Sequence, residues 1–119
     1  MIRLDRVTKV RGHERVLDRV SFHIPAGAQV GLIGPGGAGK SLILKICAGL
    51  VVPEAGQVWV DGAELGSLDA VAMASVRSKI GMLFQNYALF DFMTVEENIG
   101  FPLKQLGRHT PDEIRAEVD

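Results

Sequence analysis

The first part of the chain alternates between apolar and polar residues, a pattern typical of β-strands. Apolar residues at Ile2, Leu4 and Val7 predict a short first strand, and residues 16–24 predict a second. Residues 11–14 lie between them, so we expect an antiparallel pair joined by a tight turn. In the second strand the alternation predicts two faces, one with Val16, Asp18, Val20, Phe22 and Ile24 and the other with Leu17, Arg19, Ser21 and His23.

Two later runs are short and continuously apolar, which is typical of strands buried on both faces of a parallel sheet. They cover residues 30–33 and 80–84. Residues 40–48 are apolar nearly all round, with Lys45 as the exception, and therefore predict a buried helix. Gly49 follows at the place of a C-terminal cap.

Turn and cap residues mark the remaining elements. Asp61-Gly62 predicts a hairpin after a strand over residues 57–60. Ser67 is the candidate cap of the next helix. Thr94–Glu97 and Thr110–Glu113 have the form of capping boxes, so each predicts the start of a further helix. This order of elements predicts an α/β fold.

Residues 34–41 read Gly-Pro-Gly-Gly-Ala-Gly-Lys-Ser and match the phosphate-binding pattern G-x-x-x-x-G-K-[ST]. Backbone amides must approach phosphate oxygens closely in such a loop, and some positions need positive φ, so glycine is favoured. The following helix directs its amino-terminal N–H groups at the same anion. The alternative is a glycine-rich turn that only caps a helix. We expect the nucleotide to be bound by Gly34, Pro35, Gly36, Gly37, Ala38, Gly39, Lys40, Ser41 and Leu42.

Three residues of this segment have specific expectations. Lys40 would reach the β- and γ-phosphates as a mobile positive charge, which makes it a candidate catalytic residue, and Ser41 would offer its hydroxyl to Mg²⁺. Leu42 stands where many such loops carry a second hydroxyl for the α-phosphate, so we expect slightly weaker nucleotide binding. ATP and Mg²⁺ are the predicted ligands.

Gln85 directly follows the apolar run 80–84. Ligand groups in an α/β sheet gather beyond the carboxyl ends of strands. A neutral amide there can accept a hydrogen bond from Mg²⁺-bound water or donate one to a γ-phosphate. From the spacing alone, a solvated loop glutamine is the commoner alternative.

Several blocks, taken in order, resemble an ABC-family ATPase. They are Val16–Phe22, Pro25-x-Gly27, the phosphate loop, Ala48-Gly49-Leu50, Pro53-x-x-Gly56-x-Val58, Asp61-Gly62 and Ile80–Gln85. The resemblance implies a P-loop NTPase fold with an N-terminal antiparallel β subdomain, part of a RecA-like core and the start of a helical subdomain. It also implies that Gln85 is the catalytic Q-loop residue, which holds Mg²⁺, senses the γ-phosphate and reports to the membrane partner.

Within the family, the segment Met82–Leu103 is similar to the ATPases of MCE-type lipid transporters, including the Mla-type phospholipid system. This similarity implies phospholipid transport at the inner membrane. The alternatives are an ATPase for amino-acid import or lipoprotein release, a soluble ABC protein acting on ribosomes or DNA, and a remnant that only binds nucleotide. Arg11 lies where most ABC ATPases place an aromatic residue that stacks on adenine. Its guanidinium plane could stack on a base instead, or it could be a solvated turn residue.

The resemblance also implies partners. A second ATPase subunit would form a dimer around two ATP molecules, and the region Asn86–Thr94 would meet a transmembrane permease. Leu89, Phe90, Phe92 and Met93 would supply the apolar docking surface, or would pack within the helical subdomain. The formal net charge of −1, without a basic run, predicts no nucleic-acid partner. The N-terminus lacks the layout of a signal peptide, so we expect a cytoplasmic protein on the inner face of the membrane.

We expect the 119 residues to be the N-terminal portion of one ABC ATPase domain, truncated before the signature motif and Walker B. Phosphoryl transfer depends on positioning and charge neutralisation, and half of that apparatus lies in those motifs. The chain alone would therefore bind nucleotide without turnover, and the complete protein would hydrolyse ATP. The single cysteine, Cys47, is expected to pack in the core.

Overall fold

The computed structural model describes residues 1–118 and divides the chain into two units, Met1–Met82 and the segment from Leu83 onward. The first holds a four-stranded sheet and two α-helices, and the second holds two α-helices.

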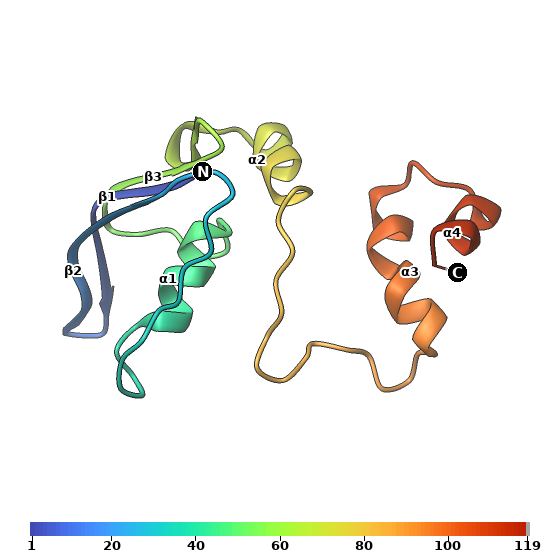
Figure 1. Cartoon of the computed structure of the whole chain (residues 1–119), viewed down its shortest axis with the longest axis horizontal. Coiled ribbons are helices and arrows are strands. Elements are labelled where there is room, and N and C mark those ends of the chain that lie inside the picture. The colour runs from blue at the N-terminus through green and yellow to red at the C-terminus, as the bar shows by residue number, and fades with distance from the viewer. Residues whose placement is uncertain (119) are drawn as a thin grey trace. The chain divides into compact units, whose positions relative to one another are not determined.

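The sheet of the first unit consists of β1 (Ile2–Arg11), β2 (Glu14–Ile24), β3 (Ala55–Val60) and β4 (Ala63–Glu64). Its strand order is β2-β1-β3-β4, and all neighbouring strands are antiparallel (Figure 1). The predicted pairing of the first two strands is confirmed. The predicted hairpin at Asp61-Gly62 is also confirmed, and both residues have the positive φ that such a turn requires, 49° and 84°.

The pairing of β1 with β2 is irregular at three places, two of which lie at Arg6 and Arg19, with φ values of 48° and 50°. At each of these two residues the backbone N–H donates a hydrogen bond to a side-chain hydroxyl on the opposite strand. The Arg6 N–H donates to Ser21 Oγ at 2.8 Å, and the Arg19 N–H donates to Thr8 Oγ1 at 3.2 Å. A bulge adds a residue and reverses the facing of side chains beyond it. Leu17 is therefore buried, 3% exposed, and its predicted place on the polar face is wrong.

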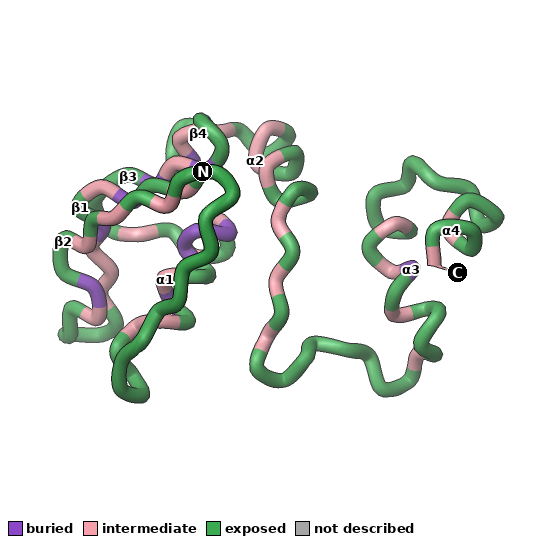
Figure 2. Tube along the Cα trace, in the orientation of Figure 1, coloured by how far each residue is buried: buried purple, intermediate pink, exposed green. Residues whose placement is uncertain are grey.

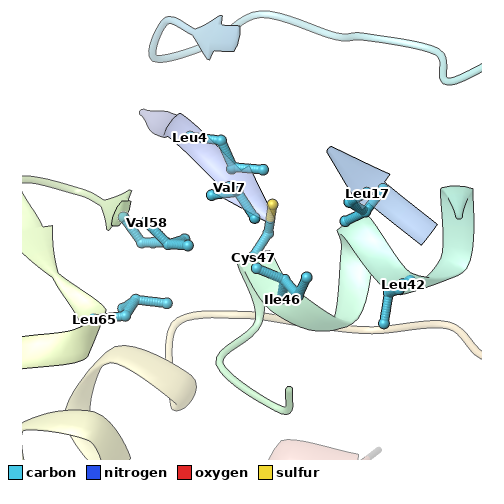
Figure 3. Close-up of a cluster of buried hydrophobic side chains, with 9 residues drawn as sticks. Leu4, Val7, Leu17, Leu42, Ile46, Cys47, Val58 and Leu65 are labelled. Carbon is cyan, nitrogen blue, oxygen red and sulfur yellow. The ribbon is translucent and has the colours of Figure 1, made fainter. Parts of the chain in front are cut away.

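The core of the first unit lies between the sheet and α1 (Lys40–Cys47). Figure 2 shows the buried segments gathered on these elements, and Figure 3 shows side chains of α1 directed toward residues of β1 and β3. Leu44 on the opposite face of the helix is 53% exposed, so the prediction of a helix buried on every side is wrong. The buried cluster consists of Leu4, Val7, Leu17, Leu42, Ile46, Cys47, Val58, Val60 and Leu65.

Gly49 ends α1 as predicted, with φ of 68°. Its N–H donates to the Ile46 carbonyl at 3.0 Å, and the Leu50 N–H donates to the Lys45 carbonyl at 2.8 Å. This pair of bonds is a Schellman motif. The Arg77 guanidinium then donates to the Gly49 carbonyl, which ties the next helix to this cap.

That next helix, α2, spans Ala70–Arg77, and Asp69 caps it by accepting the Ala72 N–H at 2.7 Å. The prediction of Ser67 as the cap is wrong. Ser67 belongs to the short 3₁₀ helix η1 (Leu65–Ser67), where its hydroxyl donates to the Glu64 carbonyl. Because the Ser67 hydroxyl bonds within η1, the residue directly before α2, Asp69, serves as its cap.

The two predicted buried strands, 30–33 and 80–84, are not strands in the structure, and this prediction is wrong. Ile33 is 99% exposed and Leu83 is 82% exposed. A strand of a parallel sheet needs hydrogen-bonding neighbours. Within residues 1–118 no strand pairs with either run.

The second unit contains α3 (Val95–Leu106) and α4 (Pro111–Val118). Both predicted capping boxes are confirmed. Thr94 and Glu97 exchange hydrogen bonds at 3.2 and 2.7 Å, and Thr110 and Glu113 exchange them at 3.3 and 2.7 Å. The two helices touch at Gly100, where an added Cβ would lie 2.9 Å from Ile114 Cγ2.

Candidate phosphate-binding site

The segment 34–39 leads directly into the amino-terminal end of α1. Gly39 is the N-cap residue with φ of 92°, and no side chain caps the helix. The first bond within the helix is donated by Ile43 to the Gly39 carbonyl, at 2.9 Å. The amides of Lys40, Ser41 and Leu42 therefore precede the helical ladder and can bind an external acceptor.

Gly39 is required for a second reason besides its φ. A Cβ on this residue would lie 2.8 Å from Leu17 Cδ2 and 3.3 Å from Val16 Cγ1. The start of α1 thus packs directly on β2. The sequence pattern indicated the backbone conformation of the loop but not this contact, because the contact joins residues more than twenty positions apart.

Lys40 points back over the loop that precedes it. Its Nζ donates to the carbonyl oxygens of Gly34 and Pro35, both at 2.6 Å. Within residues 1–118 no carboxylate forms an ion pair with it. The ammonium group therefore sits at the loop with its charge uncompensated, in reach of an anion that the same loop would bind.

The next two residues of α1 point to different sides. Ser41 is exposed, so its hydroxyl is available to a ligand. Leu42 is 9% exposed, and its side chain belongs to the core cluster with Leu17 and Ile46 (Figure 3). Leu42 can therefore contribute its amide to an anion, whereas its side chain serves the core.

The donor set fits a polyphosphate with a hard cation. The amides and the ammonium suit phosphate oxygens, and the Ser41 hydroxyl suits Mg²⁺, which takes oxygen ligands and usually keeps several waters. Within the described residues, no group of three His, Cys, Asp or Glu side chains is arranged to hold a metal by itself. A cation at this loop would accordingly depend on phosphate oxygens for most of its non-water ligands.

Arg11 lies in the same unit, at the end of β1 and opposite Glu14 of β2. It is exposed. The hairpin that carries it is the one on which Gly39 packs, through Val16 and Leu17. A role of Arg11 in base stacking stays a prediction.

Gln85 belongs to the second unit, where it is exposed at the start of a turn that includes residues 85–88. The Tyr87 N–H donates to the Phe84 carbonyl at 2.9 Å, and Tyr87 and Ala88 have positive φ. The role of Gln85 toward Mg²⁺ and the γ-phosphate stays a prediction from the family resemblance.

The apolar loop that follows Gln85 divides its side chains between two roles. The Phe90 ring packs on Phe101 of α3, with centroids 4.9 Å apart. Leu89 and Phe92 are 69% and 77% exposed. Phe90 thus packs within the unit, which was one of the two predicted alternatives. Leu89 and Phe92 are exposed, so they remain available for the other alternative, docking on a permease.

Asn98 organises this loop, a role that was not predicted from the sequence. Its Oδ1 accepts the Phe90 N–H at 2.9 Å, and its Nδ2 donates to the carbonyls of Phe90, Met93 and Thr94 at 3.0, 3.2 and 3.0 Å. A signal was present, because Asn98 is a polar residue one helical turn after the Thr94 cap. The same side chain both extends the cap and closes the loop.

Burial raises the pKa of the Cys47 thiol to about 11, so this residue is an unreactive core side chain, as predicted. Among the helices of the described residues, none combines the length and the apolar character needed to cross a bilayer.

Residues 17–119 match the family model described as ABC transporter. The chain is 43% identical over 103 residues to a probable sulfate/thiosulfate import ATP-binding protein CysA of Chlorella vulgaris, covering 87% of the chain and 42% of that protein. It is 42% identical over 104 residues to a methionine import ATP-binding protein MetN of Carboxydothermus hydrogenoformans, covering 87% and 31%. It is 42% identical over 118 residues to an Fe(3+) ions import ATP-binding protein FbpC of Photorhabdus laumondii, covering 98% and 32%.

Among solved structures, the dimeric ATP-binding cassette MJ0796 in a post-hydrolysis state, bound to ADP and Pi, has a TM-score of 0.86 and 34% sequence identity. The match covers 99% of this chain and 54% of that one. The chain thus spans 31% to 42% of the three relatives above and about half of the solved cassette.

Proposed function

Because the chain belongs to the ABC transporter family, we propose that it forms the nucleotide-binding front part of a transporter's ATP-binding subunit. The observation that carries the proposal is the geometry at the start of α1. There the Lys40 ammonium lies on the loop carbonyls beside a helix end that no side chain caps. The ligand that this arrangement favours is a polyphosphate anion, and the family makes it ATP.

Each residue of the loop then has a definite task. The amides of Lys40, Ser41 and Leu42 donate to phosphate oxygens at the positive end of the helix. Lys40 exchanges two neutral carbonyl acceptors for charged phosphate oxygens, which form stronger hydrogen bonds. Ser41 Oγ provides one ligand to Mg²⁺, and Mg²⁺, when bound, neutralises phosphate charge. By the family resemblance, Gln85 is the second protein ligand.

A comparison of two lysines on the same helix tests this proposal. We expect Lys40→Ala to weaken MgATP binding by about ten- to a hundredfold, the value of a charge-assisted hydrogen bond. Lys45→Ala is the matched control, because Lys45 is exposed in the last turn of α1. The affinity of this variant for MgATP should stay within about twofold of wild type. Titration calorimetry measures both. Equal affinities of wild type and Lys40→Ala would disprove the proposal.

For the complete subunit we propose dimerisation and ATP hydrolysis. Support comes from the solved cassette MJ0796, which is described as dimeric and as bound to ADP and Pi. We also propose a peripheral position on the cytoplasmic face of the membrane, with Leu89 and Phe92 in the segment Asn86–Thr94 contacting the permease. Their exposed apolar side chains support this contact.

The transported solute has two candidates. The similarity of Met82–Leu103 to MCE-type ATPases favours phospholipids, whereas the names of three relatives favour import of a small solute, such as sulfate, methionine or Fe³⁺. Purification of the complete transporter from its own membrane distinguishes them. Phospholipid-binding partner subunits would support the first candidate, and a soluble solute-binding protein would support the second.

A further inference from the structure

Glu54 holds the end of β1 next to the hairpin turn. Its Oε2 accepts the Val10 N–H at 2.8 Å, and its Oε1 accepts a bond from Lys9 Nζ at 2.6 Å. Lys9 Nζ also donates to the Val52 carbonyl at 2.8 Å. The two side chains therefore fasten β1 to the segment between α1 and β3.

This contact continues the sheet beyond its last paired residue. Pairing of β1 with β3 ends at Thr8 opposite Ala55, and the Glu54 N–H still donates to the Thr8 carbonyl at 3.0 Å. Val10 is two residues further along β1, so its N–H faces the same edge. The Glu54 carboxylate takes the place of the missing strand there.

The same hairpin is also held from the side of the phosphate loop. Gly39 packs so closely on β2 that a Cβ would lie 2.8 Å from Leu17 and 3.3 Å from Val16. The end of β1 and the facing part of β2 are thus held from two sides, by Glu54 at Val10 and by Gly39 at Val16 and Leu17. Arg11 directly follows Val10 and is the last residue of β1.

We propose that Glu54 and Lys9 are positioning residues for the base of the bound nucleotide, because they fix the end of the strand that carries Arg11, the residue predicted to stack on the base. The inference rests on the proposed nucleotide-binding function of the loop and on the predicted stacking role of Arg11. Two observations separate it from simple sheet stabilisation. The contact lies beyond the paired part of β3, and it fixes the backbone amide adjacent to Arg11.

Hydrogen bonding from Lys9 and from the Val10 amide lowers the pKa of Glu54, so the carboxylate stays charged near neutral pH and keeps both contacts. Glu54→Gln keeps an oxygen for the Val10 N–H but loses the ion pair. Glu54→Ala loses both.

The experiment compares MgATP with inorganic tripolyphosphate, which has the phosphates and no base. We expect Glu54→Ala to weaken MgATP binding roughly three- to tenfold, the scale of a cation–π contact, and to leave tripolyphosphate affinity within about twofold. Glu54→Gln should weaken MgATP binding less than Glu54→Ala does. In an Arg11→Ala background the effect of Glu54→Ala on MgATP should vanish, since the two residues act as one unit.

Asp18→Ala is the matched control, an exposed carboxylate on the same hairpin that pairs with Arg15 at 3.3 Å. This variant should bind both MgATP and tripolyphosphate with the affinity of wild type. Equal losses for MgATP and tripolyphosphate in Glu54→Ala, no loss for either, or an undiminished loss in the Arg11→Ala background would each overturn the inference. Failure of the proposed function has a different result, in which Lys40→Ala leaves both ligands bound as in wild type.

Discussion

Different interactions stabilise each of the two units of this chain. In the first unit, apolar side chains of three strands and α1 bury one another, and Val7 and Ile46 are 0% and 1% exposed. In the second unit, Gly100 is the only residue classed as buried among residues 83–118. Its ordered contacts are two capping boxes, the bonds of Asn98 and the packing of Phe90.

This difference shows what each unit needs in order to be stable. Burial of apolar area is the dominant favourable term in folding, whereas an exposed hydrogen bond contributes about 1 kcal/mol or less. The first unit contains its own core. The second exposes Val95 at 76% and Ile99 at 53% on α3, so it buries little apolar area of its own.

The largest expected effect is in the core of the first unit. Ile46→Ala should destabilise that unit by about 2–5 kcal/mol, because it removes a buried side chain and leaves a cavity. Hydrogen exchange resolved by residue should show faster exchange of β1 and β3 amides and unchanged exchange in α3. Equal acceleration in α3 would mean that the two units unfold as one.

The second effect is confined to the second unit. Asn98→Ala should cost about 1 kcal/mol there, because it removes hydrogen bonds to Phe90, Met93 and Thr94 that are exposed or half-buried, and the freed groups can bond to water. Gln105→Ala, an exposed amide on the same helix, is the control and should change little. The Phe90 and Met93 amides report the change by hydrogen exchange. Faster exchange in β1 would contradict this expectation, because the side-chain hydrogen bonds of Asn98 all join residues of the second unit.

The smallest expected effect comes from acid. Hydrogen bonds from the backbone of Thr94 and of Thr110 lower the pKa of Glu97 and Glu113 below the ordinary 4.5. Their folded pKa is depressed, so their stabilisation is present above about pH 4.5 and is lost as pH falls through the lowered values. Below that pH, α3 and α4 should lose helical signal before the sheet loses its protection. Glu97→Gln should reduce the acid dependence of α3, and earlier loss of the sheet would contradict the account.

The sequence predicted local features well and long-range ones poorly. Caps and tight turns depend on a few neighbouring residues, so Thr94, Gly49 and Asp61-Gly62 were assigned correctly. The bulge at Arg19 was missed because it requires the Thr8 hydroxyl on another strand. Residues 30–33 were assigned as a strand from composition, but a strand exists only when a partner supplies hydrogen bonds.

The same distinction applies to the candidate site. The spacing of residues 34–41 predicted the phosphate loop, because its glycines and lysine form a short local motif, and their contacts with a nucleotide stay a prediction. The contact of Gly39 with β2 and the Glu54 contact with Val10 join distant parts of the chain, and no short motif indicated either.

Hydrogen exchange of the loop amides upon addition of MgATP tests the central claim most directly. The account predicts slower exchange at the amides of residues 36–42, with the largest change at Lys40, Ser41 and Leu42, and the same change in Lys40→Ala only at about ten- to a hundredfold higher MgATP. Unchanged exchange at these amides while ATP is bound would place the nucleotide elsewhere and contradict the account.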